Sequence, residues 1–150
     1  MTSGKAELAL VPEDEPAYRV DHQIGFILRK ANQRHVAIFA SRIADLTPPQ
    51  FAALSKLNDV GETSQNQLGA LIAMDAATIK GVIDRLRARG FVEVGKHEVD
   101  KRRLMVGLTD QGRAAIERLI PLAEKITADT LAPLSPREAA TFLKLLAKLA

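Results

Sequence analysis

Hydrophobic residues recur at spacings of three and four along most of the chain, which is typical of amphipathic helices. Between Tyr18 and Asp45 the pattern runs without a proline and predicts one long helix. Residues 47–50 form a capping-box sequence with proline at the first helical position, and Gly61 marks an end. The chain is therefore expected to begin with a long helix and a shorter one.

Two more short helices are predicted directly afterwards. Residues 64–67 form an S-x-x-Q box, and Asp75 can cap a further helix after a turn at Ala73 and Met74. That helix, residues 76–89, has an apolar stripe and an outward face of small and polar residues. Two helices joined so tightly predict a helix-turn-helix. The stripe consists of Ile79, Val82, Ile83 and Leu86, and the outward positions are Ala77, Lys80, Gly81, Asp84 and Ala88.

The pattern changes from helical to extended after Gly90. Residues 91–94 and 104–108 are typical of strands, and the loop between them, residues 95–103, is polar and basic. These segments predict a β-hairpin with a charged tip, placed directly after the helix-turn-helix.

Two final helices complete the predicted fold. One begins at Thr109 and Asp110 and is expected to kink at Pro121, and the last begins with a capping box at Ser135. The fold class is therefore mainly α with a small β-hairpin wing. In this arrangement N- and C-terminal dimerisation helices flank a winged helix-turn-helix.

A length of 150 residues fits one domain, or one subunit that completes its core by dimerising. We expect residues 1–17 to form a flexible tail and residues 18–150 to form a single domain. Within it, 47–109 is the expected winged helix-turn-helix core, and 18–46 and 110–150 are the expected dimerisation helices. The apolar faces of these terminal helices have little of their own chain to cover them, which predicts a homodimer.

Composition narrows the chemistry and the compartment. The chain has no cysteine, which excludes disulfides, thiolate metal sites and thiol-based redox sensing by this chain. Residues 1–16 contain no long apolar run and resemble neither a signal peptide nor a membrane anchor. We therefore expect a cytoplasmic protein.

Positive charge is concentrated in the middle of the chain. The formal net charge is only +3, whereas residues 80–103 contain eight basic and four acidic residues. A basic centre that includes a candidate helix-turn-helix predicts a polyanionic partner, and DNA is the polyanion that this motif binds.

The second helix of a helix-turn-helix enters the major groove, where small residues allow close approach and polar ones reach base edges. Thr78 and Lys80 can reach bases, whereas Arg85 and Arg87 can hold phosphates. Asp84 should repel phosphates unless it pairs with a neighbouring arginine. Periodicity alone favours an ordinary solvated helix, but the adjacent basic hairpin favours DNA binding. The candidate DNA-binding residues are Ser64, Gln65, Ala76, Ala77, Thr78, Lys80, Arg85, Arg87, Lys96, Asp100, Lys101, Arg102 and Arg103.

Two segments carry a resemblance to a known family. Residues 68–92, LGALIAMDAATIKGVIDRLRARGFV, and residues 100–109, DKRRLMVGLT, resemble the MarR family of transcription regulators. The resemblance implies a dimer with interlocked terminal helices, wings at its flanks, and DNA affinity that falls when a small molecule binds. Repression is the commoner mode of action in that family. The pattern D-x-R-x-x-x-V-x-L-T is met by Asp100, Arg102, Val106, Leu108 and Thr109.

The resemblance also implies a role for the wing tip. Arg102 would insert its guanidinium into the minor groove, where narrow A·T tracts have a negative potential that attracts arginine. Asp100 would orient Arg102. Asp100 is also common as a turn-forming residue in hairpin loops, and the two roles are compatible.

MarR-type proteins commonly bind effectors between the dimerisation helices and the DNA-binding lobe, which directs attention to the first helix. At about 3.6 residues per turn His22, Phe26 and Arg29 share a face, and an arginine beside an aromatic ring suits a planar carboxylate. Residues 25–39 resemble the branch that senses aromatic acids or their coenzyme A thioesters, in which the positions of Arg29 and His35 contact the ligand. The alternative is that these residues are solvated helix charges and an interface histidine. Free acid and thioester both stay open as effectors.

Two other function classes make different predictions. An enzyme would need a nucleophile with a base, a metal cluster or a phosphate cradle, but the chain contains no H-E-x-x-H, G-x-S-x-G or P-loop motif, and His22, His35 and His97 are far apart. We therefore expect no catalysis and no cofactor. A nonspecific architectural protein would bind nucleic acid without sequence preference and without a ligand. A regulator would discriminate an inverted-repeat operator with half-sites about one helical turn apart.

Overall fold

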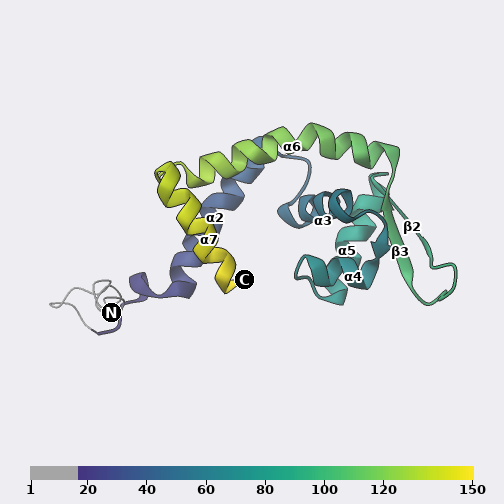
Figure 1. The fold of residues 1–150 in the computed structure, drawn as a ribbon, viewed down its shortest axis with the longest axis horizontal. Helices are drawn as coiled ribbons and strands as arrows, with labels where there is room; N and C mark the ends of the chain where they lie inside the picture. The colour runs from purple at the N-terminus through teal and green to yellow at the C-terminus, as the bar shows by residue number, and fades with distance from the viewer. Residues whose placement is uncertain (1–16) are drawn as a thin grey trace. The chain divides into compact units, whose positions relative to one another are not determined.

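The computed structural model describes residues 17–150, most of which are helical (Figure 1). The expected flexible tail, residues 1–17, lies outside the described residues except for Ala17. The chain divides into two compact units, residues 1–37 and 38–150, and helix α2 (Ile24–Arg42) contains the division.

The first helix is shorter than its hydrophobic pattern predicts. A 3-10 turn, η2 (Val20–His22), precedes α2, and Gln23 between them has an extended backbone with a ψ of 135°. The prediction of one helix from Tyr18 to Asp45 is therefore wrong at both ends. Hydrophobic spacing misses the break because one extended residue interrupts the helix without interrupting the apolar pattern. His22 consequently does not belong to the helix that contains Phe26 and Arg29.

Helix α3 (Pro48–Val60) begins and ends where the sequence indicates. The Thr47 side chain accepts a hydrogen bond from the Gln50 N–H, and the Gln50 side chain accepts one from the Thr47 N–H, so the predicted capping box is confirmed. Gly61 follows the helix with a φ of 79°, a left-handed conformation that glycine adopts without steric cost. Leu54 and Leu57 are buried on the inner face.

Helices α4 (Gln65–Leu71) and α5 (Ala76–Ala88) form the predicted helix-turn-helix. Each has a side-chain N-cap: Ser64 Oγ accepts from the Gln67 N–H at 3.1 Å, and Asp75 Oδ1 accepts from the Thr78 N–H at 2.7 Å. The turn between them closes through Ala73, which has a φ of 56°. The local cap signals therefore located both helices correctly.

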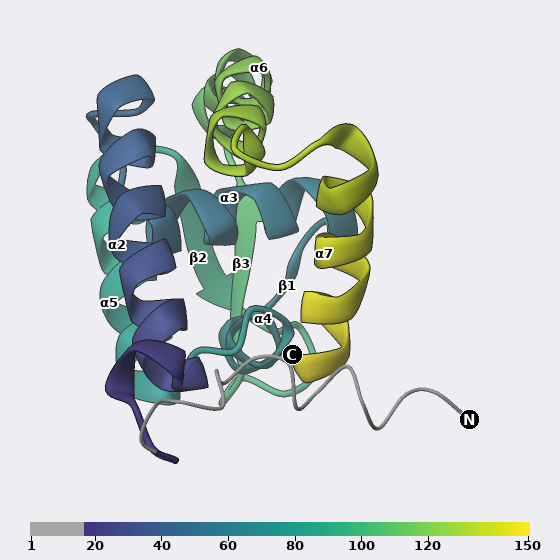
Figure 2. The ribbon, with the colours of Figure 1, turned by 90° about the vertical axis from the view of Figure 1, so that its left-hand side faces the viewer.

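A three-stranded antiparallel sheet forms the wing. Strands β2 (Val92–Lys96) and β3 (Leu104–Leu108) pair so that Val92 lies opposite Leu108 and Lys96 opposite Leu104, which confirms the predicted hairpin. The first strand was predicted at residues 91–94, so the structure adds residues 95 and 96 of the predicted loop to it. A further strand that the sequence did not predict, β1 (Thr63–Ser64), pairs with the other side of β3. Figure 2 shows β3 between its two partners. Two residues are too few to produce a recognisable alternating pattern.

Helices α6 (Asp110–Leu131) and α7 (Pro136–Leu149) complete the second unit. Helix α6 continues through Pro121 as one element, and Thr109 caps its start. Helix α7 has the predicted capping box at Ser135, but none of its residues is buried. Its large apolar side chains are therefore available to another surface.

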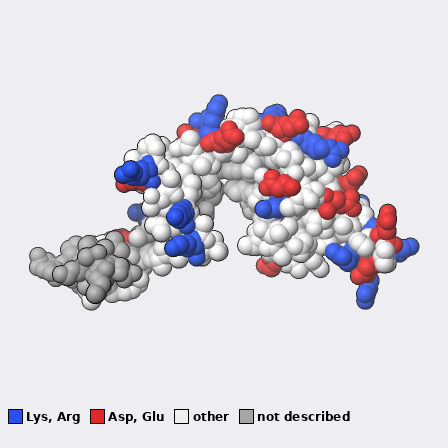
Figure 3. Space-filling model, viewed as in Figure 1, with Lys and Arg blue, Asp and Glu red and all other residues white. Residues whose placement is uncertain are grey.

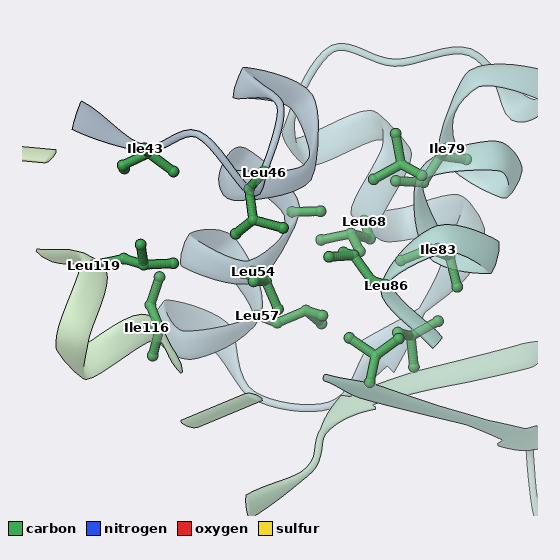
Figure 4. Close-up of a cluster of buried hydrophobic side chains, with 14 of the residues drawn as sticks. Ile43, Leu46, Leu54, Leu57, Leu68, Ile79, Ile83, Leu86, Ile116 and Leu119 are labelled. Atoms are coloured by element: carbon green, nitrogen blue, oxygen red, sulfur yellow. The ribbon is translucent and has the colours of Figure 1, made fainter. Parts of the chain in front are cut away.

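One hydrophobic core organises the second unit. Figure 4 shows leucine and isoleucine side chains from α3, α4, α5 and α6 meeting around α3. All four residues of the predicted inward stripe of α5, Ile79, Val82, Ile83 and Leu86, are buried there. Their burial determines which face of α5 is directed outward, and that face positions the candidate site.

Candidate nucleic-acid interface

The outward face of α5 presents the side chains that the sequence assigned to DNA. Thr78, Lys80, Arg85 and Arg87 are all exposed, and so are the small residues Ala76 and Ala77 in the first turn. Small side chains at the beginning of a recognition helix leave room for the backbone to approach base edges. The structure therefore brings these residues together on one solvent-facing helix that the core holds in place.

Asp84 has a partner on the same face of α5. Lys80 Nζ lies 2.8 Å from Asp84 Oδ2, one helical turn away. The sequence left open a pairing of Asp84 with an arginine, whereas the structure pairs it with Lys80. The Lys80 charge balances the carboxylate, which reduces the repulsion that Asp84 would otherwise exert on a phosphate.

The N-cap of α5, the candidate recognition helix, is the carboxylate of Asp75. The backbone N–H of Thr78 holds the pKa of Asp75 below its ordinary value of 3.8, and the Thr78 side chain acts in the same direction. A carboxylate that accepts a hydrogen bond at a helix N-terminus is stabilised in its charged form. Asp75 therefore fixes the start of α5, which is the part of the helix that would enter the groove.

The beginning of α4 lies beside the wing. Ser64 and Gln65 line a surface hollow of about 150 Å³ together with Asn66, Arg102 and Arg103. Ser64 was predicted to contact DNA, but the residue is only 6% exposed and its side chain caps α4. Ser64 therefore has a structural role as the cap of α4, and its DNA contact stays a prediction. Asn66, which lines the same hollow, is exposed.

The wing tip presents one arginine far into solvent. The Arg102 side chain is 92% exposed, and its Nε donates to Asp100 Oδ1 at 3.2 Å. The backbone N–H of Arg102 donates to the same oxygen at 3.1 Å, and the Asp100 carbonyl accepts from the Arg103 N–H. Asp100 thus both contacts the Arg102 guanidinium and closes the turn, whereas the minor-groove role of Arg102 stays a prediction.

Charges of both signs gather at the tip of the hairpin. Lys96, Lys101 and Arg103 are exposed there beside Arg102, and Figure 3 shows acidic atoms among the basic ones. The acidic residues Glu98 and Asp100 belong to the same loop. The wing is therefore a mixed surface with a basic excess, and the basic side chains extend from its tip.

The candidate effector residues all belong to the first unit. His22 lies in η2 and not in α2, so the prediction that it shares a helical face with Phe26 and Arg29 is wrong. Phe26 and His35 are half-buried, and Arg29 is exposed. The cation over the Phe26 ring is Lys30, with Nζ 5.5 Å from the ring centroid. The i,i+4 spacing of Phe26 and Lys30 was the signal that could have identified this contact.

Neither a metal centre nor a membrane helix is found in the described part of the chain. Within residues 17–150, no group of three or more His, Cys, Asp or Glu side chains could hold a metal ion. No helix in this range is long and apolar enough to cross a membrane.

Comparison with known proteins identifies close relatives. Residues 46–104 match the MarR family. The HTH-type transcriptional repressor NicR of Pseudomonas putida is 39% identical, over 98% of this chain and 94% of NicR. A probable transcriptional regulator from Pseudomonas aeruginosa has a crystal structure with a TM-score of 0.86 and 52% identity, covering 88% of this chain and all of that one.

A second solved structure bears on the ligand. It is that of Bordetella bronchiseptica BpsR and concerns the regulation of its DNA binding by 6-hydroxynicotinic acid. Its TM-score is 0.85 and its identity 41%, over 89% of this chain and 97% of that chain. The similarity therefore extends well beyond the helix-turn-helix.

Proposed function

The chain belongs to the MarR family of DNA-binding transcription regulators, and we propose that it is a repressor released from its operator by a small aromatic carboxylic acid or its coenzyme A thioester. The observation that carries the effector class is the 41% identity with BpsR, whose DNA binding is regulated by 6-hydroxynicotinic acid. The similarity to NicR, a repressor, supports the direction of regulation. A free hydroxylated aromatic acid is the first effector to test.

The DNA contacts follow from the two exposed elements of the second unit. We propose that α5 enters the major groove with Thr78 and Lys80 toward the bases and Arg85 and Arg87 toward phosphates. Arg102 enters the adjacent minor groove from the wing. The exposure of all five side chains and the Asp100–Arg102 contact support this assignment.

The proposed active form is a homodimer on an inverted repeat. Phe142, Leu143 and Leu149 of α7 are exposed large apolar side chains, as are Ile24 and Ile27 of α2. Exposed apolar faces on the terminal helices favour pairing with a second copy. In that dimer residues 18–150 act as one domain. The proposed compartment is the cytoplasm, where the DNA partner lies.

The proposed effector site uses α2. Phe26 supplies an aromatic face, Arg29 and Lys30 supply positive charge, and His35 supplies a further polar group. A planar aromatic carboxylate matches this combination, because the ring can stack and the carboxylate can pair with a guanidinium. His22 stays a candidate through its place in turn η2, directly before the helix.

The experiment is a titration of the purified protein on its own upstream DNA at fixed salt, since salt alone changes such affinities greatly. The ligands are 6-hydroxynicotinate, benzoate, a hydroxycinnamate and their coenzyme A thioesters. We expect affinity for the upstream DNA at least about a thousandfold above that for random DNA, and release by one compound. Equal affinity for both DNAs would favour the architectural alternative, and specific binding without release would refute the effector class.

A further inference from the structure

The wing loop contains an imidazole whose hydrogen bonds are directed into the loop itself. His97 is half-buried at the end of β2, and its Nδ1 accepts two backbone N–H groups, from Val99 at 3.1 Å and from Asp100 at 2.9 Å. Asp, Asn and Ser side chains commonly hold turns in this way by accepting from the backbone two residues on. Here a histidine performs that task beside the proposed DNA contact.

These bonds belong to a connected set that closes residues 97–103. The His97 N–H donates to the Arg103 carbonyl at 3.0 Å, and the Arg103 N–H donates to the Asp100 carbonyl at 3.0 Å. Asp100 in turn accepts from the N–H and the Nε of Arg102. The imidazole therefore fixes the backbone of Asp100, and the Asp100 carboxylate fixes the exposed guanidinium.

We propose that His97 is a positioning residue for DNA binding, because its Nδ1 accepts the two backbone N–H groups that hold the turn from which Asp100 presents Arg102. The proposal rests on the proposed minor-groove role of Arg102. His97 acts through Asp100 and Arg102 and does not need to touch DNA. A preformed turn keeps Arg102 in one arrangement before binding, so less conformational entropy is lost when it enters the groove.

The acceptor role of His97 Nδ1 predicts the sign of the effect that a lower pH has on DNA affinity. A ring nitrogen that accepts two N–H donors holds no hydrogen in that arrangement, so the turn needs Nδ1 as an acceptor. Protonation would turn Nδ1 into a donor that faces two other donors, and the turn would open. Added positive charge by itself would instead strengthen binding to DNA. The sign of the pH effect therefore separates a positioning role from a simple charge contact.

The charged groups around His97 come from two elements. Lys96 and Glu98 flank it in the hairpin, and Asp100 lies across the turn. Glu62, from the segment before β1, lines the same surface hollow as His97, together with Met105. These groups are unchanged in a His97 variant, so the comparison of wild type with that variant isolates the imidazole.

The test measures operator affinity of H97A, H97N, R102A and the H97A/R102A double variant, with V99A as a matched control. We expect H97A to bind about fivefold more weakly, the fold-change that corresponds to one net hydrogen bond. H97N should bind like wild type, because the asparagine Oδ1 can accept the same two N–H groups. Val99 is 88% exposed and shares the turn, so V99A should have no effect. The double variant should bind no more weakly than R102A alone.

The pH arm compares wild type with H97N from about pH 8 to about pH 5.5, the range in which imidazoles protonate. Wild type should lose affinity relative to H97N as the pH falls. A parallel pH profile, an H97N as weak as H97A, or additive losses in the double variant would each overturn the inference. If R102A weakens binding and H97A does not, only the His97 role fails. If R102A binds like wild type, the wing contact and the His97 role both fail.

Discussion

Arg89, the C-cap of the recognition helix α5, forms hydrogen bonds to Asp45 in the segment between α2 and α3. Its Nη1 donates to the Asp45 carbonyl, and its Nη2 donates to the Asp45 carboxylate at 3.2 Å. Arg118 of α6 lies 3.9 Å from the same carboxylate oxygen, and the Arg89 guanidinium stacks 4.8 Å from the centroid of the Phe91 ring. Asp45 therefore links the C-terminal end of α5 to the segment between α2 and α3 and to α6.

Loss of the Asp45 carboxylate should weaken the attachment of the C-terminal end of the recognition helix α5. D45A is expected to lower the free energy of unfolding by up to about 1 kcal/mol, because the ion pair is partly exposed. Operator affinity should fall severalfold, because the end of α5 keeps its bond to the backbone carbonyl at position 45 but loses the ion pair with the carboxylate. Thermal unfolding and fluorescence anisotropy measure the two effects. D59A, which removes an exposed carboxylate of α3 outside this network, is the control. Equal operator affinity of D45A and D59A would show that Asp45 does not position α5.

The exposed wing arginine should contribute strongly to operator binding. R102A is expected to weaken binding by more than about tenfold, or about 1.4 kcal/mol, because the minor-groove contact is lost. The dimer should stay intact, since Arg102 lies at the tip of the hairpin. Operator titrations and size-exclusion chromatography test both statements. R137A removes one positive charge from α7 and serves as the charge-matched control, and a loss of equal size in R137A would contradict a specific wing contact.

Release of Lys80 from Asp84 should strengthen DNA binding. D84N is expected to raise affinity for operator and random DNA by a similar factor, because it removes a negative charge and frees the Lys80 ammonium. Titrations at several salt concentrations measure these changes. An unchanged affinity of D84N for both DNAs would contradict the prediction and show that the Asp84 charge does not weaken DNA binding.

The cap of α5 should make stability depend on pH in the acid range. The pKa of Asp75 is lowered by its hydrogen bond from the Thr78 N–H, so the folded state favours the carboxylate. This contribution is present above the unfolded value of 3.8 and is lost as the pH falls through the lower folded value. D75N can cap the helix but does not titrate at this position. The free energy of unfolding of D75N relative to that of wild type should therefore rise below about pH 4. Thermal unfolding of both proteins at each pH tests this, and parallel curves would contradict it.

The effector anchor should be separable from DNA binding. R29A is expected to bind the operator like wild type but to need far more aromatic acid for release, because the carboxylate loses its guanidinium partner. K30A tests the neighbouring cation that lies over the Phe26 ring. Release curves at fixed DNA measure both variants. If R29A releases DNA at the wild-type ligand concentration and K30A does not, Lys30 is the anchor.

Local sequence signals identified most of the helices and the wing. The caps at Thr47, Asp75 and Ser135 are hydrogen bonds between residues three apart, and the apolar stripe of α5 is a property of one helix. Such features depend on neighbouring residues alone, so composition and spacing predict them. The motif from Asp100 to Thr109 likewise identified the family.

Other features depend on contacts that leave no local pattern. The pairing of β1 with β3 joins Thr63 to Val106, and the link between Asp45 and Arg89 spans 44 residues. By contrast, Asp84 with Lys80, and His97 with Val99 and Asp100, are contacts between residues two to four apart, and the structure adds only which of the neighbouring side chains is the partner. The sequence by itself therefore determined the order of elements and the family, because caps and periodicity are local. Only the tertiary structure decided that β1 pairs with β3 and that Asp45 holds Arg89, because those contacts form between segments that the core brings together.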